Sequence, residues 1–361
     1  MNILLVCGET SSNNYGIELA ITLKKANHNV YSIGDRYLAT KTTQVYKIDS
    51  ANHSVNIGQW MYRHKLIKKM RAAVINYHQQ FIFDRVVIID FPTYNFSIAK
   101  VFQLLNIPIT TFITPNFWMW KQKRLAKRLV NYSDKIITIY KKEYEFYKQM
   151  TNKPIYYFGH PISCSKSIVD QKRIDNSHHT IGIFPGSRHS EINNQLPRIC
   201  KVISKLKKKI SIDFVIECAN KTVISTIEKI LNQHDCDDIP IVQKIDISLN
   251  LAIATPGTIT LKLVLMRVPM VIIGRVSSFS YFIAKYVLRL NIPFVGLPNA
   301  IINQMICPEY IQNKVPVSTI VSKIKHLISG NNSADMVMAY ESIIKEFQAE
   351  KDYYEKIVDI I

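Results

Sequence analysis

The stretch IGIFPGSRHSEI, residues 181–192, joins a short apolar run, a Pro-Gly turn and the beginning of a helical pattern. The apolar residues predict a buried strand that stops at Pro185 and Gly186. In α/β proteins, ligands bind beyond the carboxyl ends of the strands, and the free N–H groups of a helix N-terminus favour anions there. Ser187 and Arg188, which the turn presents at this corner, are therefore candidates for binding an anion.

Strand-like apolar runs alternate with helix-like segments along the whole chain of 361 residues. After the first strand, NILLVCG, we expect a Gly/Ser/Asn turn and a helix near 16–26. The polar, aperiodic segment 163–180 indicates a linker. Two β-α-β-α series divided by a linker predict an α/β fold of two Rossmann-like domains facing a cleft. We place these domains at 1–165 and 178–335, followed by a C-terminal helical tail at 336–361.

The composition predicts a cytoplasmic protein without a cofactor or metal. The longest apolar runs are far shorter than the roughly 20 residues that cross a bilayer, and the sequence enters a strand pattern without a secretory signal. The six cysteines show no C-x-x-C spacing, which favours reduced thiols and argues against structural zinc. A dinucleotide fingerprint and a Walker A sequence are both absent from the sequence.

The charge balance is strongly basic, with 46 Lys and Arg against 27 Asp and Glu. Much of the excess lies in residues 63–71, 121–128 and 205–209. Such a balance suits anionic lipid, nucleic acid or a phosphorylated substrate, and compositional drift explains it equally well. Because no nucleic-acid-binding module is recognisable, we expect no nucleic-acid partner.

One acidic cluster, HDCDD at residues 234–238, contains a D-x-D spacing that is compatible with a metal–diphosphate site. The cluster lies between a predicted helix and a predicted strand, where acidic loops are common. An ordinary loop is therefore the alternative.

Five stretches, taken in order, resemble the bacterial lipid-A-disaccharide synthase family (glycosyltransferase family 19). The similarity spans nearly the whole chain, and FGHPI (158–162) also fits it. The stretches are GETSSNNYG (8–16), IDFPTYN (89–95), TPNFWMWKQKR (114–124), FPGSRHSEI (184–192) and the series ATPGTITL, VPMVIIGRVS, GLPN and CPE within 254–309.

The resemblance implies an inverting glycosyltransferase of the GT-B type. Its reaction transfers 2,3-diacylglucosamine from UDP to the 6-hydroxyl of 2,3-diacylglucosamine 1-phosphate, which forms a β-1,6 lipid A disaccharide and releases UDP. The partners implied are these two substrates and the inner face of the inner membrane, on which the enzyme would lie peripherally. An oligomeric assembly is left open.

The family pattern assigns catalytic roles to three residues of this chain. Asp90 ends the run RVVIID and matches the family's essential Asp, which makes it the candidate general base. Glu9 matches an acidic position near the reacting sugars, and Arg188 matches an essential Arg that stabilises the leaving diphosphate. The alternatives are helix capping by Asp90, a favourable helix dipole at Glu9 and a plain surface Arg188.

The nucleotide is expected at the strand–helix corners of the second domain. Alongside Gly186, Ser187 and Arg188, the stretch TPGTIT offers Gly257 for close backbone approach and Thr258 as a donor. By resemblance, Asn299 and Glu309 also line this site, although a loop Asn held by its own turn is a rival interpretation.

Membrane or acyl-chain contact is expected at Trp60, Met61, Trp118 and Trp120. The basic segment near 60–75 has the composition of a membrane-surface helix, and a solvated basic face is the alternative. Core packing is the alternative for the tryptophans that flank Met119.

The chain departs from the family pattern at two positions. Ser12-Asn13 replaces Gly-Asp, and Lys262 stands where the family has an acid that accepts hydrogen bonds from ribose hydroxyls. These departures keep two alternatives open. One is a divergent, weakly active or non-catalytic lipid-binding paralogue, and the other is a different UDP-sugar transferase or epimerase on the same fold.

Overall fold

The chain folds into two compact units in the computed structural model. Unit 1 comprises Met1–Cys164 and Glu346–Ile361, and unit 2 comprises Ser165–Lys345. The structure describes residues 1–8, 10–48, 58–90, 92–119, 122–164, 179–218, 220–274, 294–312, 315–329 and 332–361, without the side chains of 10–11, 58–66 and 92–95. Most of the expected linker, residues 165–178, lies outside the described residues.

Unit 1 is built on a parallel sheet with the strand order β3-β2-β1-β4-β5-β6-β7. Its continuous apolar runs form these strands because both faces of a parallel sheet are covered by helices. The strands are β1 (Asn2–Cys7), β2 (Asn29–Gly34), β3 (Thr43–Lys47), β4 (Arg85–Ile89), β5 (Ile109–Phe112), β6 (Lys135–Thr138) and β7 (Ile155–Tyr157).

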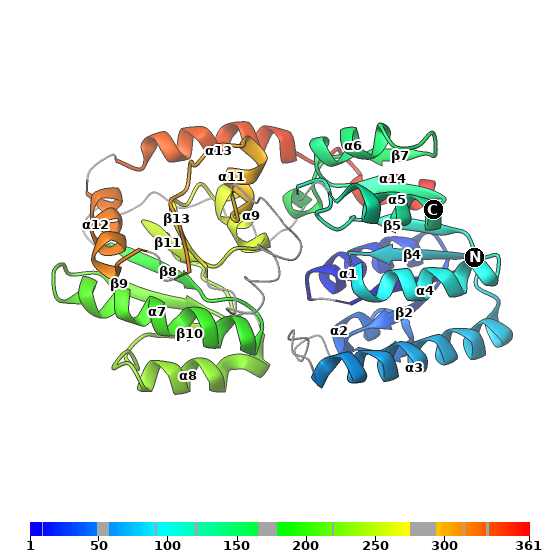
Figure 1. Cartoon of the computed structure of the whole chain (residues 1–361), viewed down its shortest axis with the longest axis horizontal. Helices are drawn as coiled ribbons and strands as arrows, with labels where there is room; N and C mark the ends of the chain where they lie inside the picture. The colour runs from blue at the N-terminus through cyan, green and yellow to red at the C-terminus, as the bar shows by residue number, and fades with distance from the viewer. Residues whose placement is uncertain are drawn as a thin grey trace. The chain divides into compact units, whose positions relative to one another are not determined.

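The helices of unit 1 cover both faces of this sheet. They are α1 (Thr10–Lys25), α2 (Arg36–Ala39), α3 (Gly58–Phe81), α4 (Pro92–Leu104), α5 (Lys123–Tyr132), α6 (Lys141–Lys148) and α14 (Tyr353–Ile360). Right-handed crossovers put α3, α4 and α5 on one face, where each packs beside the next, whereas α1 packs against α14 (Figure 1). The core between sheet and helices includes Val6, Ile88, Val74 and Phe102.

Helix α1 begins earlier than the sequence pattern predicts, at Thr10 rather than near residue 16. The expected turn residues Ser12 and Asn13 are buried within the helix. The Asn13 side-chain oxygen accepts a hydrogen bond from the backbone N–H of Asp35 at 3.0 Å, so an internal partner compensates for its poor helix propensity. A Cβ on Gly16 would lie 2.7 Å from the Cys7 sulfur, and glycine therefore lets α1 approach β1.

Unit 2 contains a second parallel sheet, with the order β10-β9-β8-β11-β12-β13. Two α/β units with parallel sheets are the predicted fold class. The strands are β8 (Thr180–Phe184), β9 (Asp213–Glu217), β10 (Ile241–Val242), β11 (Leu251–Ala254), β12 (Met270–Gly274) and β13 (Glu309–Ile311). The helices are α7 (His189–Lys207), α8 (Ile224–Asn232), α9 (Thr258–Leu265), α11 (Leu297–Ile302), α12 (Val317–Ile328) and α13 (Ala334–Phe347).

The C-terminal segment that we expected as one helical tail forms two helices, α13 and α14. Within unit 2, Met336 and Tyr340 of α13 are buried, and Glu341 pairs with Arg267. The last residues belong to unit 1, where α14 lies against α1. None of the described helices combines the length and apolarity that a bilayer crossing requires.

Candidate functional site

The corner between β8 and α7 in unit 2 is a tight glycine turn held by one glutamate. Gly186 has φ +109°, a conformation that favours glycine, and a Cβ there would lie 2.8 Å from a Glu191 carboxylate oxygen. Glu191 accepts hydrogen bonds from the Ser187 backbone N–H at 3.1 Å and from the Arg188 guanidinium at 2.9 Å. Arg188 caps the N-terminus of α7, and its side chain is 31% exposed. The corner therefore presents an accessible, oriented cation beside a helix N-terminus.

A second corner follows the neighbouring strand β11. Gly257 has φ +152°, and, its two chain neighbours aside, no atom of the described residues lies within 4 Å of the place a Cβ would take, so the described part of the chain leaves this backbone open to an approaching group. Thr258 is the first residue of α9 and is exposed. The Thr255 backbone and hydroxyl groups both donate to the Phe184 carbonyl, at 3.0 and 3.2 Å, which fixes the end of β11 to the end of β8. Helices α7 and α9 thus begin side by side at the carboxyl edge of the sheet.

Lys262, the most marked departure from the family pattern, forms an ion pair that the sequence did not reveal. Its ammonium lies 2.9 Å from a carboxylate oxygen of Glu217, the last residue of β9. The side chains are 18% and 10% exposed. The other Glu217 oxygen accepts from the Ile245 backbone N–H at 3.0 Å. An acidic side chain is therefore present at this edge, although it comes from β9 and not from α9.

Asn299 and Glu309 act together as an internal brace. Asn299 is fully buried, and its amide donates to the Cys307 carbonyl and to Glu309, both at 2.7 Å, while its oxygen accepts from the backbone of residues 306 and 307. Glu309 also accepts from the backbone N–H groups of Val295 and Gly296, just before α11. These contacts favour the interpretation of Asn299 as a loop residue held by its surroundings, and its contact with nucleotide stays a prediction.

In unit 1, Asp90 follows β4 directly and lies in a strained backbone. Its φ is +30°, and its N–H donates to the carbonyl of Ile113 at 3.2 Å. Ile113, just after the neighbouring strand β5, has φ +66°, which is rare for a β-branched residue. Strain of this kind persists where surrounding structure enforces it, and it clusters at functional sites. The half-buried Asp90 thus lies at the carboxyl edge of the unit 1 sheet, where the backbone is strained.

A cluster of buried aromatic rings lies near Asp90. The ring of His160 stacks on Phe347 at 4.9 Å and meets Tyr140 at 5.2 Å and Tyr15 at 6.4 Å. Burial and, second, the negative charge of Asp90 raise the pKa of the Tyr15 phenol. Burial lowers the pKa of His160 to about 3, so its imidazole is neutral. Sequence reasoning noted FGHPI only as a family stretch and did not identify this cluster.

A buried carboxyl group, Glu143, was also missed. It accepts hydrogen bonds from the Thr114 hydroxyl and from the backbone N–H groups of Ile139 and Tyr140, at 2.9 and 3.3 Å for the backbone pair. Burial raises the pKa of Glu143 to about 7, although these hydrogen bonds oppose the shift. A Glu three residues into a helix was the available signal, because that spacing is typical of a capping box.

The membrane and acyl-contact predictions are only partly described. The Trp118 ring packs 5.5 Å from that of Tyr140, and its buried indole N–H has no partner among the described residues. This packing favours the interior alternative for Trp118. Glu9 and Trp120 lie outside the described residues, as do the side chains of Trp60 and Met61.

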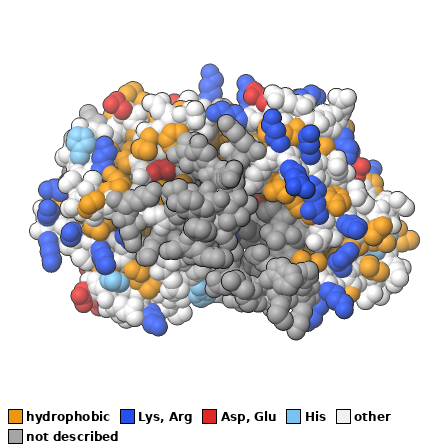
Figure 2. Space-filling view, in the orientation of Figure 1, with side chains coloured by type: hydrophobic (Ala, Val, Ile, Leu, Met, Phe, Trp, Pro, Cys, Tyr) orange, Lys and Arg blue, Asp and Glu red, His pale blue; other side chains and the backbone are white. Residues whose placement is uncertain are grey.

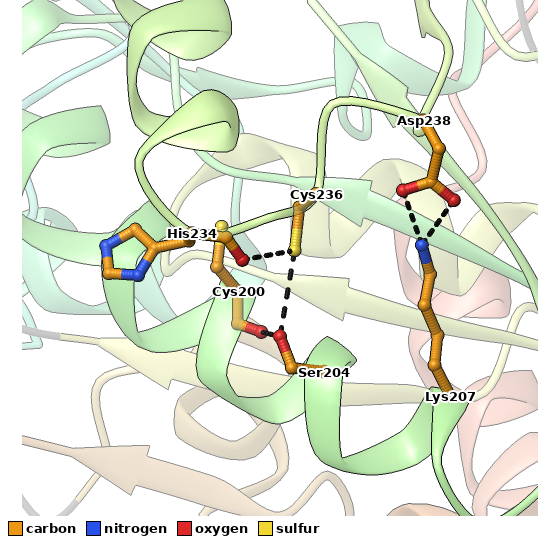
Figure 3. A network of polar contacts seen from close by, with 6 residues as sticks. All are labelled: Cys200, Ser204, Lys207, His234, Cys236 and Asp238. Atoms are coloured by element: carbon orange, nitrogen blue, oxygen red, sulfur yellow. Dashed lines mark hydrogen bonds and ion pairs between the residues drawn. The ribbon is translucent and has the colours of Figure 1, made fainter.

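The acidic cluster at 234–238 lies at the opposite end of the unit 2 sheet from these corners. Asp238 precedes β10. Both of its carboxylate oxygens accept from the ammonium of Lys207, at the end of α7, with Oδ1 at 2.6 Å (Figure 3). Cys236 is buried and donates to the His234 carbonyl at 3.3 Å. The structure therefore favours the loop interpretation of the D-x-D spacing. Among the described residues, no group of three His, Cys, Asp or Glu could hold a metal ion.

Comparison with protein families gives a match over nearly the whole chain. A family model described as lipid-A-disaccharide synthetase matches residues 3–358. A lipid-A-disaccharide synthase of Coxiella burnetii is 27% identical over 346 residues, covering 92% of this chain and 90% of the relative. One from Geobacter metallireducens is 24% identical and covers 99% and 96%.

Solved structures share the architecture at low sequence identity. The glycosyltransferase of kitacinnamycin has a TM-score of 0.66 at 11% identity, covering 99% of this chain and 97% of that one. UDP-GlcNAc 2-epimerase from Neisseria meningitidis, bound to UDP-GlcNAc, has a TM-score of 0.61 at 14% identity, covering 100% and 99%. These likenesses show the fold, which is the GT-B arrangement of two parallel-sheet α/β domains.

Proposed function

The chain belongs to the lipid-A-disaccharide synthase family of glycosyltransferases, and we propose that it catalyses that synthase reaction. In this reaction UDP-2,3-diacylglucosamine donates its sugar to 2,3-diacylglucosamine 1-phosphate, with inversion, and UDP departs. The observation that carries the proposal is the family match over residues 3–358. The family itself indicates the two substrate classes, a UDP-sugar and a lipid-linked sugar. The acylation pattern of the two substrates is our proposal.

Unit 2 holds the nucleotide in this proposal. The diphosphate lies at the N-termini of α7 and α9, where Arg188 carries a permanent charge and Gly257 admits close backbone approach. Glu191 orients the guanidinium through the 2.9 Å contact, and a guanidinium is a planar donor group whose geometry suits phosphate. Because negative charge grows on the diphosphate as the glycosidic bond breaks, a fixed cation there stabilises the transition state more than the ground state.

Unit 1 supplies the base in this proposal. Asp90 takes the proton from the 6-hydroxyl of the acceptor as that oxygen attacks the sugar. Support comes from its place at the strained end of β4, where its N–H donates to the Ile113 carbonyl, because backbone strain of this kind clusters at active sites. The neutral His160 and the aromatic rings around it form a buried cluster within the same unit.

We also propose that the protein binds the inner membrane face peripherally through α3, α4 and α5. These helices carry Lys or Arg at five, one and four positions respectively, and no Asp or Glu. Exposed apolar side chains lie among them, including Leu104 at 71% and Leu125 at 37% exposure. Figure 2 shows Lys and Arg side chains mixed with hydrophobic ones over this part of unit 1. Such a mixture suits an anionic lipid surface.

The test of the reaction is UDP release by the purified protein, given both acylated substrates in detergent. We expect Asp90→Asn to lower turnover by about 100-fold or more, and Arg188→Ala by about 100- to 1,000-fold. Asp359→Asn and Arg267→Ala make the same two changes at exposed residues and should leave turnover unchanged. UDP release that does not require the acylated acceptor, or epimerisation of the donor without UDP release, would instead favour another activity on this fold.

A further inference from the structure

We propose that Glu217, held in place by Lys262, is the carboxylate that accepts hydrogen bonds from the ribose hydroxyls of the nucleoside diphosphate. This inference rests on the proposed function in one respect, namely that the ligand at the β8–α7 corner is a nucleoside diphosphate. Everything else follows from the position, exposure and contacts of the two residues.

The position of Glu217 is that of a ribose-binding acid in a βαβ unit. In βαβ units that bind a dinucleotide, the glycine turn after the first strand receives the phosphates, and an acid farther along the unit binds the ribose. This chain lacks the dinucleotide fingerprint and shares only the order of these elements. Here β8, α7 and β9 form the unit, Gly186 makes the turn, and Glu217 ends the second strand. Ile183 and Ile216 are paired across the two strands, so Glu217 lies one residue beyond that pair, at the level where β8 runs into the turn.

The contacts of Glu217 leave it able to accept further hydrogen bonds. A carboxylate has about four lone-pair positions. The described contacts use two of them, with Lys262 on one oxygen at 2.9 Å and the Ile245 N–H on the other at 3.0 Å. The side chain is 10% exposed, so it is fixed in direction and still reachable. A ribose diol supplies two O–H donors to such a group.

Two other glutamates at the same edge of the sheet, Glu191 and Glu309, accept hydrogen bonds from groups of the protein itself. Glu191 holds Arg188 and the Ser187 backbone. Glu309 accepts from the backbone N–H groups that precede α11 and from the buried Asn299. Each of these carboxylates accepts from the backbone N–H groups of its own corner, whereas the described contacts of Glu217 are one backbone N–H, that of Ile245, and the Lys262 ammonium of α9.

Lys262 is the positioning residue of this pair. It is the sole charged residue in the apolar helix α9, TITLKLVL. Its ammonium balances the charge of a carboxylate that is nine-tenths buried, which would otherwise be costly to keep ionised. An acid at position 262 would place two carboxylates together, and their repulsion would favour protonation of one. In a chain with Lys262, the carboxylate that accepts from the ribose hydroxyls is therefore still present, and it comes from β9 instead of α9.

The experiment measures binding of UDP, 2′-deoxy-UDP and 3′-deoxy-UDP to the full chain by calorimetry. We expect the unaltered chain to prefer UDP to one or both deoxy analogues by about tenfold, as for a hydrogen bond to a charged group. Glu217→Gln should weaken UDP binding by about tenfold and reduce the preference to less than about twofold. Lys262→Met should reduce the preference in the same way, and Lys262→Arg should retain it. Glu341→Gln, at an exposed ion pair, is the matched control and should change nothing.

The outcomes separate this inference from the proposed function. If the unaltered chain binds UDP but binds both deoxy analogues equally well, the ribose assignment is wrong, and this result needs no variant. If Glu217→Gln keeps both its affinity for UDP and its preference, the assignment is again wrong while a nucleotide site remains. If the folded, unaltered chain binds no UDP, both the inference and the proposed function are overturned.

Discussion

The buried carboxyl group of Glu143 predicts a specific dependence of stability on pH. Burial raises its pKa from the ordinary value of 4.5 to about 7 in the folded chain. Because the folded state holds this proton more tightly, the stabilisation is complete below pH 4.5 and is lost as the pH rises through about 7. At 1.36 kcal/mol for each pKa unit, the loss amounts to about 3 kcal/mol.

The perturbation is Glu143→Gln, which keeps the shape of the protonated side chain and cannot ionise. Its oxygen can accept from the backbone N–H groups of Ile139 and Tyr140, and its amide can donate to the Thr114 hydroxyl. Relative to the parent, we expect the variant's free energy of unfolding to rise by about 3 kcal/mol between pH 4.5 and pH 8.

The assay is urea unfolding followed by tryptophan fluorescence. All three tryptophans, at positions 60, 118 and 120, lie in the unit that contains Glu143, so the signal reports on unit 1. Glu145→Gln makes the same chemical change on the exposed side of α6 and should reproduce the parent's pH profile. Parallel pH profiles for Glu143→Gln and the parent would refute the reasoning, because they would show that Glu143 does not titrate in this interval.

Three substitutions test close packing and buried hydrogen bonds. Gly16→Ala should lower the free energy of unfolding of unit 1 by about 1–3 kcal/mol through overpacking, because the new Cβ would lie 2.7 Å from the Cys7 sulfur. Unfolding followed by fluorescence should show a smaller loss when the same substitution is made in a Cys7→Ala background. Gly186→Ala should displace Glu191 and weaken UDP binding in calorimetry, with unchanged affinity arguing against the corner as the phosphate site. Asn299→Ala leaves buried backbone groups without partners and should cost about 2–4 kcal/mol in urea unfolding followed by circular dichroism; a loss below 1 kcal/mol would contradict the brace.

The sequence alone was sufficient for the fold class, the family and the proposed chemistry. Short apolar runs that alternate with amphipathic segments specify parallel α/β units because each parallel strand must be buried on both faces. Family motifs such as FPGSRHSEI are read from local order and need no contacts. The match to the family model over residues 3–358 confirms the family prediction, and the two parallel sheets confirm the fold class.

The tertiary structure decided what each polar side chain does. The sequence pattern predicted a turn where α1 begins, because Ser12 and Asn13 are poor helix formers and the hydrogen-bond partner of Asn13, Asp35, is distant in sequence. Lys262 looked like the loss of an acid until Glu217, 45 residues away, was found beside it. Burial and long-range partners set charge balance and hydrogen bonding, and neither is encoded in local sequence pattern.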